Sequence, residues 1–298
     1  MRTPKDSLTR REMLAASAGA AGALAFGGAA EAAERAEAGR VHRAPGRLKQ
    51  SVSRWPYASI PLDSFCRSAA AMGLQGIDLL QPEDWPVARD HGLTCSMGYP
   101  TKRRDFIETG FNDRANHAML LRELEQTIPL AARAGVPNVI AMFGNRRGRS
   151  DAEAAANCVE GLTRIKRLAE EQQVTVCVEL LNSKVDHKDY QGDRTAFGVA
   201  VVRAVDSPRV KLLYDIYHMQ IMEGDVIRTI RENVRHIAHF HTGGVPGRHE
   251  LDDSQELTYR AVARAIADLG FTGFVAHEFV PTKDPLTALR EAVAVCTV

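Results

Sequence analysis

The segment Val174-Thr-Val-Cys-Val-Glu-Leu-Leu181 is the clearest of eight short apolar runs, and an amphipathic stretch of helix length follows it at Arg194–Val205. Short β-branched runs that alternate with helical patterns are typical of βαβ units. Outward from this segment, the same unit repeats along the chain in both directions. Strands are expected at Leu48–Ser53, Gly76–Leu80, Leu93–Met97, Asn138–Phe143, Val174–Leu180, Val210–Asp215, His236–His241 and Gly273–Phe279.

Eight helical patterns follow these strands, and glycines close several of them. They are Leu62–Met72, Glu83–His91, Arg114–Ala134, Asp151–Glu171, Arg194–Val205, Gly224–Asn233, Glu256–Leu269 and Pro285–Val295. Eight strands that are each followed by one helix predict a parallel α/β architecture, and a length of roughly 250 residues suits one closed (β/α)8 barrel. The alternative is an open doubly wound sheet. The barrel is favoured because the chain has no P-loop and no Gly-x-Gly-x-x-Gly motif after its first strand.

The first residues have the order of an export signal. Paired arginines, Arg10 and Arg11, precede an apolar run from Met13 to Phe26, and small-residue sites follow at positions 30–32 and 36–38. This order is typical of a bacterial twin-arginine signal, so we expect a periplasmic or secreted protein. The alternative is a membrane anchor, but the run is short and rich in glycine, so no stable membrane insertion is expected after cleavage. The expected organisation is an export signal and cleavage region at 1–38, a linker at 39–47 and one barrel domain at 48–298.

Composition narrows the classes of partner. The chain has 298 residues, 45% hydrophobic and 25% charged, with a formal net charge of +1. This balance is ordinary for a globular protein and shows no excess of basic residues, so no nucleic-acid partner is expected and a small-molecule partner is favoured. Five cysteines without a Cys-x-x-Cys pair argue against a disulfide framework and a structural zinc site. A homo-oligomer is compatible with the sequence.

Four residues of ligand type fall at or near the ends of four consecutive predicted strands. They are Glu179, Asp215, His241 and Glu278, which follow one another at intervals of 36, 26 and 37 positions. Each interval is about one strand-plus-helix unit of ~30 residues. Because the carboxyl ends of barrel strands converge on one face, we expect these four side chains to meet.

A divalent metal ion is the simplest reason for such a cluster. A lone buried carboxylate costs several kcal/mol or becomes protonated, and a cation removes that cost for three carboxylates at once. Three oxygens and one nitrogen suit Mn²⁺ or Mg²⁺ best and also accept Co²⁺ or Zn²⁺. The alternative for each residue alone is a cap or a salt bridge at a strand–loop junction, but four in register favour the metal.

Two further clusters follow these residues. His218 comes three positions after Asp215, in an expected loop above the barrel, where it could bind a substrate oxygen or orient a ligand residue. The glycine-rich segment 241–249 carries Arg248, whose fork matches a carboxylate or two neighbouring hydroxyls. The alternative for Arg248 is a solvated residue in a surface turn.

These motifs together resemble the hydroxypyruvate isomerase family within the xylose-isomerase-like barrel superfamily. The resemblance runs from about Leu48 to the end of the chain and rests on Val-Glu179-Leu-Leu-Asn, Tyr-Asp215-Ile-Tyr-His-Met-Gln, Gly-Arg248 and His-Glu278-Phe. The second of these, with the Met-Glu-Gly224 that trails it, is the most specific.

The resemblance implies a xylose-isomerase-like TIM barrel with the same four metal ligands, in which Glu179 and Glu278 also form the catalytic acid–base pair. His218 and Arg248 match substrate-binding positions, and Lys184 and His187 are expected beside them, with Trp55, Tyr99 and Asn145 at the rim of the pocket. Two positions differ. His241 stands where hydroxypyruvate isomerases usually have Gln, as in the related ketose 3-epimerases. The acidic residue that both relatives carry six places after Glu179 is absent, and Asp186 comes one place later.

The expected reaction is proton transfer through an enediolate, which interconverts a keto and an aldo group, as from hydroxypyruvate to tartronate semialdehyde. A ketose 3-epimerase or a lyase of 3-keto-glycosides or C-glycosides would need the same site. A non-catalytic periplasmic sugar-binding protein would need aromatic platforms, yet aromatics are only 6% of the chain. A metal-dependent endonuclease would need a basic groove.

Overall fold

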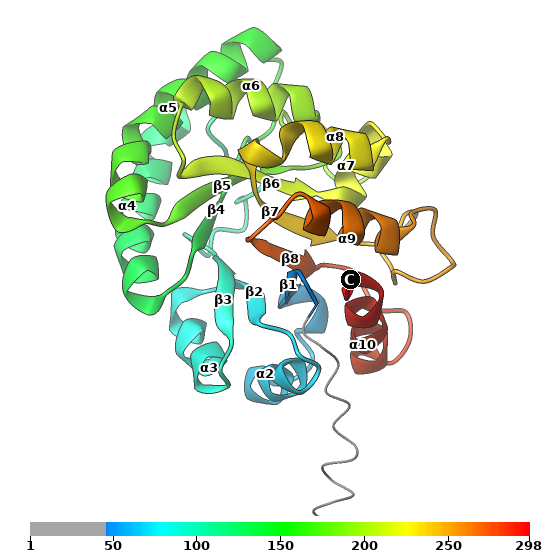
Figure 1. Cartoon of the computed structure of the whole chain (residues 1–298). Coiled ribbons are helices and arrows are strands. Elements are labelled where there is room, and N and C mark those ends of the chain that lie inside the picture. The colour runs from blue at the N-terminus through cyan, green and yellow to red at the C-terminus, as the bar shows by residue number, and fades with distance from the viewer. Residues whose placement is uncertain (1–45) are drawn as a thin grey trace, which may run out of the picture. The chain divides into compact units, whose positions relative to one another are not determined.

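The computed structural model describes residues 46–298 and shows a closed barrel of eight parallel strands, in the order β1 to β8. Helices lie outside the ring of strands (Figure 1). The strands are β1 Lys49–Ser53, β2 Gly76–Leu80, β3 Thr94–Gly98, β4 Asn138–Met142, β5 Thr175–Leu180, β6 Val210–Asp215, β7 Ile237–Thr242 and β8 Phe274–His277. The expected (β/α)8 barrel is confirmed, and the open sheet is excluded by the pairing of β1 with β8.

The α-helices of the described chain are α2 Leu62–Ala71, α3 Trp85–Asp90, α4 His117–Ala134, α5 Asp151–Gln172, α6 Thr195–Val205, α7 Ile216–Met222, α8 Val226–Asn233, α9 Tyr259–Asp268 and α10 Pro285–Cys296. Most strand and helix ends lie within one or two residues of the expected positions. The main difference is α7, which begins directly after β6, where the sequence analysis expected a loop. The export signal, its cleavage region and most of the linker lie outside the described residues.

Local signals in the sequence explain the longest helices. The Ser150 side chain accepts a hydrogen bond from the backbone N–H of Glu153, so Ser150 is the N-cap of α5. Helix α4 ends at Gly135, which has the left-handed φ of 72° that glycine adopts without a steric penalty. These caps mark where α5 begins and where α4 ends.

Strand register brings the expected ligand residues to one level. Asp215 of β6 is the Cα partner of His241 of β7, and Glu179 of β5 pairs with Leu213, two residues before Asp215. The register of β1 to β4 is less regular. Strands β2 and β3 shift register on both sides of Asp78, and β3 and β4 share one Cα pair, Gly98 with Val139.

The segment between β3 and α4 crosses the carboxyl end of β4. The backbone N–H of Phe111 donates to the carbonyl of Met142, and that of Asn112 donates to Phe143, both over 3.0 Å. This crossing places residues 99–107 beside the face of the barrel at which the expected ligands end. The loop after β3 therefore becomes a wall of the site.

The described chain closes on itself and encloses its cysteines. The backbone N–H of Arg47, which lies in the expected linker, donates to the carbonyl of Val298 over 2.9 Å. All five cysteines are buried and free, which agrees with the expected absence of disulfides. Within residues 46–298, no helix combines the length and apolar character that a membrane span requires.

Candidate metal centre and active-site cavity

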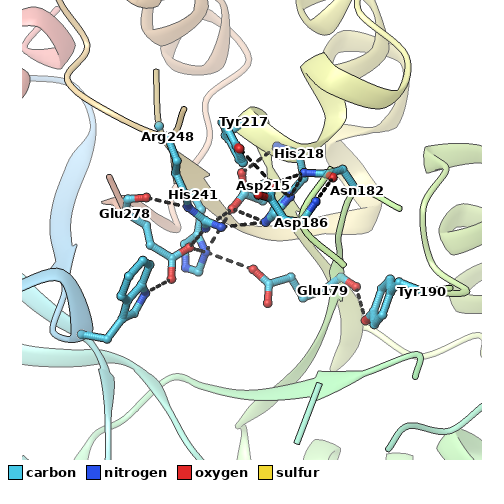
Figure 2. A network of polar contacts seen from close by, with 12 residues as sticks. Glu179, Asn182, Asp186, Tyr190, Asp215, Tyr217, His218, His241, Arg248 and Glu278 are labelled. Carbon is cyan, nitrogen blue, oxygen red and sulfur yellow. Dashed lines mark hydrogen bonds and ion pairs between the residues drawn. The ribbon is translucent and has the colours of Figure 1, made fainter. Parts of the chain in front are cut away.

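The structure brings Glu179, Asp215, His241 and Glu278 together at the carboxyl end of the barrel (Figure 2). All four are buried, and one potential ligand atom from each lies within 4.8 Å of the others. His241 Nδ1 is 2.6 Å from Glu278 Oε2, 3.2 Å from Glu179 Oε1 and 3.8 Å from Asp215 Oδ2. The convergence expected from the strand ends is thus present, with Glu278 one residue beyond the end of β8.

These donor atoms fit a divalent cation. His241 Nδ1 is buried and has no hydrogen-bond partner among the described residues, although carboxylate oxygens surround it. Once a cation displaces its proton, Nδ1 together with the three carboxylates would offer the three-oxygen, one-nitrogen set of a hard metal. Asp215 also caps α7, since its side chain accepts the backbone N–H of His218 over 3.1 Å. Oδ1 of Asp215 is therefore a helix cap, as in the alternative interpretation of this residue, whereas Oδ2 points toward the cluster.

Burial and charge separate the two glutamates. Burial raises the pKa of Glu179 to about 7. His241 opposes this shift, whereas the charges of Glu278 and Asp215 add to it. Burial alone would also raise the pKa of Glu278, but the positive charges of His241 and Arg248 outweigh it and lower the pKa to about 2. In the metal-free protein, the Glu179 carboxyl group therefore holds a proton below about pH 7 while Glu278 is ionised. Groups separated in this way are suited to acid–base catalysis.

Arg248 reaches the centre from the loop after β7. Its Nη2 donates to Asp215 Oδ2 over 2.7 Å and also contacts Glu278 Oε2. Gly243 leaves room for this side chain, because a Cβ at that position would lie only 3.0 Å from Arg248 Cγ. Arg248 lies at the cluster, with 15% of its side chain exposed, so the alternative of a solvated surface residue is wrong.

His218 lies in helix α7, so its expected position in a loop is wrong. It is fully buried and does not line the cavity. Its Nδ1 is 2.7 Å from Asn182 Nδ2, and its Nε2 is 2.8 Å from Arg248 Nη1. Burial, and then the charge of Arg248, lower its pKa well below the usual value. This geometry supports the reading of His218 as a residue that orients Arg248 and Asp215.

Asp186 lines the cavity although the sequence places it one position late. The side chain of Asn182 accepts the backbone N–H groups of Val185 and Asp186, both over 2.9 Å, which forms a tight turn after β5. Asp186 then accepts a hydrogen bond from the hydroxyl of Tyr217 over 2.8 Å. An acidic group therefore faces the cavity from this loop despite the displaced position.

Of the two further residues expected at the substrate, His187 lines the cavity and Lys184 does not. Lys184 Nζ donates to the carbonyls of Ile221 and Met222 over 2.8 and 3.2 Å, so it caps the end of α7. Its assignment to the substrate is therefore wrong, because free carbonyls at a helix end attract the ammonium group. Trp55 and Tyr99 line the cavity as expected, whereas Asn145 does not.

The cavity above the cluster has a volume of about 770 Å³. One wall is apolar, with Phe106, Ile107, Ile140, Met142 and Leu181. The rim is cationic and was missed by the sequence analysis, with Lys102, Arg103 and Arg104 on the loop after β3. Lys102 and Arg103 pair with acidic residues, but Arg104 forms no ion pair within residues 46–298. Consecutive basic residues in that loop, Lys102-Arg-Arg104, were the signal available in the sequence.

Sequence analysis also missed Asp78, which lies in the barrel interior and is fully buried. Its Oδ2 is 2.8 Å from His241 Nε2, on the side of the ring opposite to the carboxylate cluster. Burial would raise the pKa of Asp78, but His239 and His241 outweigh it and hold the pKa below its usual range. A strand residue flanked by apolar neighbours, as in Gly76-Ile-Asp-Leu-Leu80, gave no sign of this contact.

Comparison with known proteins places this fold and site in a family. The family model described as the xylose isomerase-like TIM barrel matches residues 66–297. A 2-oxo-tetronate isomerase from Cupriavidus necator is 34% identical over 228 residues, which are 76% of this chain and 80% of that protein. A putative hydroxypyruvate isomerase from Homo sapiens is 27% identical over 240 residues, which are 79% of this chain and 80% of that protein.

Among solved structures, the 3-keto-D-glucoside 4-epimerase from E. coli shares the fold with a TM-score of 0.69 and 19% identity, covering 83% of this chain and 98% of the other. The resemblance seen in the motifs is confirmed, and the names of the two curated relatives agree with the expected isomerase class. The chain belongs to the xylose isomerase-like TIM barrel family.

Proposed function

We propose that this protein is a divalent-metal-dependent isomerase that moves a proton between neighbouring carbons of a short 2-keto acid, as from hydroxypyruvate to tartronate semialdehyde. The observation that carries the proposal is the pair Glu179 and Glu278, whose buried carboxyl groups approach the same nitrogen of His241 from two different strand ends (Figure 2). An acid and a base beside one reacting centre are what a keto–aldo isomerisation requires.

Glu179, Asp215, His241 and Glu278 would hold the cation, with Mn²⁺ or Mg²⁺ favoured by the three oxygens and Co²⁺ or Zn²⁺ as alternatives. A bound divalent cation would polarise the substrate carbonyl and make the neighbouring C–H more acidic. The chain's own side chains then determine where the proton goes.

The two glutamates would act in turn. One takes the proton from the hydroxyl-bearing carbon, the hydroxyl proton passes to the former carbonyl oxygen, and the other delivers a proton to the former carbonyl carbon. Trp55 orients Glu278, because its indole N–H donates to Glu278 Oε1 over 2.5 Å. Tyr190 holds the strand end at Glu179, since its hydroxyl donates to the Glu179 carbonyl over 3.0 Å. Both carboxyl groups are therefore positioned before a substrate arrives.

Arg248 would bind the substrate carboxylate. Its guanidinium lies beside both Asp215 and Glu278, and a planar fork of donors matches a carboxylate. Arg104, which lines the cavity and forms no ion pair within residues 46–298, adds a positive charge at the rim that favours an anionic substrate. These charges favour a keto acid over a neutral sugar.

The size of the cavity supports a second candidate. A volume of about 770 Å³ lies within the range of pockets for drug-sized ligands, which is larger than a three-carbon acid needs. A four-carbon oxo acid, a ketose for 3-epimerisation, or a 3-keto-glycoside or C-glycoside for elimination would fill more of it. All of them require the same proton abstraction, so the metal centre would be shared.

A solvent-deuterium exchange screen tests these candidates. Protein loaded with Mn²⁺ is incubated in D₂O with hydroxypyruvate, a 2-oxo-tetronate, a ketohexose and a 3-keto-glucoside, and mass spectrometry measures deuterium in each recovered compound. We expect exchange with the keto acids and its loss after treatment with a chelator. Exchange with the ketohexose alone would replace the keto-acid proposal with epimerisation, and exchange with none would reject the reaction class.

We also propose that the protein is exported in its folded state. The paired arginines Arg10 and Arg11 support this proposal, and the five free, buried cysteines are compatible with folding in a reducing compartment. Replacing both arginines with lysine should retain the protein in the cytoplasm of a bacterial host, as measured by fractionation. Unchanged export of that variant would argue against a twin-arginine signal.

A further inference from the structure

A second buried polar cluster lies in the barrel interior and touches the far side of His241. It consists of Asp78, Ser96, His239 and His241, none of which is exposed to solvent. Asp78 Oδ2 is 2.8 Å from His241 Nε2, and Asp78 Oδ1 is 3.0 Å from His239 Nε2. The two oxygens of one carboxylate thus face two imidazoles of the same strand.

The backbone of β2 is irregular at this residue. The register with β3 shifts on both sides of Asp78, and the next residue, Leu79, has a left-handed φ of 56°. A leucine rarely adopts this conformation, because its Cβ crowds the backbone, so the fold must stabilise it through other contacts. Bulges of this kind redirect a side chain, and here the redirected side chain is a carboxylate that enters the core.

Asp78 is held from several strands. Ser96 of β3 donates its hydroxyl to Oδ1 over 2.6 Å, and Ser53 of β1 lies 3.5 Å from Oδ2. Burial of a carboxylate without partners costs free energy. The Asp78 carboxylate avoids this cost, because it has hydrogen-bonding neighbours on β1, β3 and β7.

The two nitrogens of His241 therefore have different surroundings. Nδ1 faces the oxygens of Glu179, Asp215 and Glu278, whereas Nε2 faces Asp78 alone. A carboxylate accepts only, so Nε2 must carry the proton that forms this hydrogen bond. When a bound cation displaces the proton from Nδ1, Nε2 stays the donor to Asp78, and the lone pair of the neutral ring lies on Nδ1.

We propose that Asp78 is a positioning residue of the metal centre, which fixes the orientation of His241 and selects the tautomer whose Nδ1 lone pair faces the three carboxylates. This role rests on the proposed metal centre. Partners of this kind keep a histidine ligand aligned and make it a stronger donor, and their loss weakens metal binding about 10- to 100-fold.

The test measures Mn²⁺ binding by titration calorimetry, together with thermal unfolding in the presence of a chelator. In Asp78→Asn, the uncharged amide should weaken Mn²⁺ binding about 10- to 100-fold. Asn138→Ala is the matched control, since Asn138 is also buried and donates to the Ser96 carbonyl without touching His241. The control should lower the unfolding temperature and leave the Mn²⁺ Kd unchanged.

A double-mutant cycle separates positioning from general destabilisation. If Asp78 acts through His241, Asp78→Asn should change the Mn²⁺ Kd less than about twofold in a His241→Gln background. Equal weakening in both backgrounds would overturn the role, as would wild-type affinity in Asp78→Asn. If Asp78→Asn does not fold, Ser96→Ala takes its place as the test, because it removes a hydrogen bond to Asp78. Mn²⁺ binding should then be about two- to fivefold weaker, and an unchanged Kd would overturn the role.

A different set of results would reject the proposed function instead of the positioning role. Wild-type protein that binds no Mn²⁺, Mg²⁺, Co²⁺ or Zn²⁺ would reject the metal centre, and with it the role of Asp78. Equal Mn²⁺ affinity in wild-type protein and in Asp78→Asn would leave the metal centre standing and reject only the positioning role.

Discussion

Strands β5 to β8 and strands β1 to β4 form two halves of the barrel that differ in regularity and in chemistry. Strands β5 to β8 pair with one another at four or five positions each, with one register shift between β6 and β7, and carry Glu179, Asp215, His241 and Glu278 at or just beyond their ends. In the second half, β2 shifts register against β3, and β3 pairs with β4 at one position. This half contributes the cationic rim, part of the apolar wall and the buried Asp78.

The difference shows that one half of the barrel carries the candidate metal ligands and the other half shapes the cavity. Ligands of one ion must lie at one level, and regular register between neighbouring strands supplies that level. The cavity also needs walls and a rim. The loop 99–113 after β3 provides part of both, and it follows the irregular pairs that β3 forms with β2 and β4. Variants of the regular half should therefore abolish the reaction, whereas variants of the irregular half should tune it.

The largest effect is expected in the regular half from Glu179→Gln and Glu278→Gln. Each amide keeps the shape of the side chain and removes the acid–base group, so turnover should fall at least about 1000-fold. Steady-state kinetics on the substrate found in the exchange screen measure this loss, and elemental analysis follows the metal content, which should change less. Full activity in either variant would contradict the proton-transfer mechanism.

Arg248→Lys should have the next largest effect. A point charge replaces the fork that fits a carboxylate, so KM for a keto acid should rise about 10- to 100-fold. Arg104→Lys is the matched control from the irregular half, and its KM should stay close to wild type. Equal KM values for the Arg248 variant and wild type would show that another group binds the carboxylate.

The affinity for metal should increase with pH, by about tenfold per unit for each proton displaced. The raised pKa of Glu179, about 7, keeps it protonated in the metal-free protein at pH 6. Burial would lower the pKa of His241, but Glu278 and the hydrogen bonds around the ring raise it well above its usual value, so His241 is also protonated there. Because the cation must displace these protons, its binding should weaken as pH falls from 8 to 6. Calorimetry in buffers of different ionisation enthalpy would measure the proton release, and pH-independent affinity would contradict the assignment of Glu179 and His241 as ligands.

The smallest effect is expected at the rim. Arg104→Gln removes a cation that forms no ion pair within the described chain, so kcat/KM for an anionic substrate should fall about two- to fivefold. The loss should be larger at low ionic strength, where charges are screened less. A loss as large as that of Arg248→Lys would mean that the irregular half binds the substrate directly.

Sequence reasoning succeeded where strand order alone decides position. Glu179, Asp215 and His241 end or nearly end their strands, and all strand ends of a parallel barrel meet on one face whatever the loops do. It failed where a side chain's direction depends on distant partners. Lys184 turns toward the end of α7, and the helical position of His218 depends on the capping by Asp215.

The sequence by itself therefore determined the (β/α)8 fold, the family and the four residues of the candidate metal centre, because apolar periodicity and spacing encode strands and their ends. Only the tertiary structure decided that Arg248 reaches Asp215 and Glu278, that a cationic rim faces the cavity and that Asp78 enters the core beneath His241. These placements arise from an irregular register, a left-handed residue and hydrogen bonds between strands far apart in the chain, and none of them leaves a periodic pattern in the sequence.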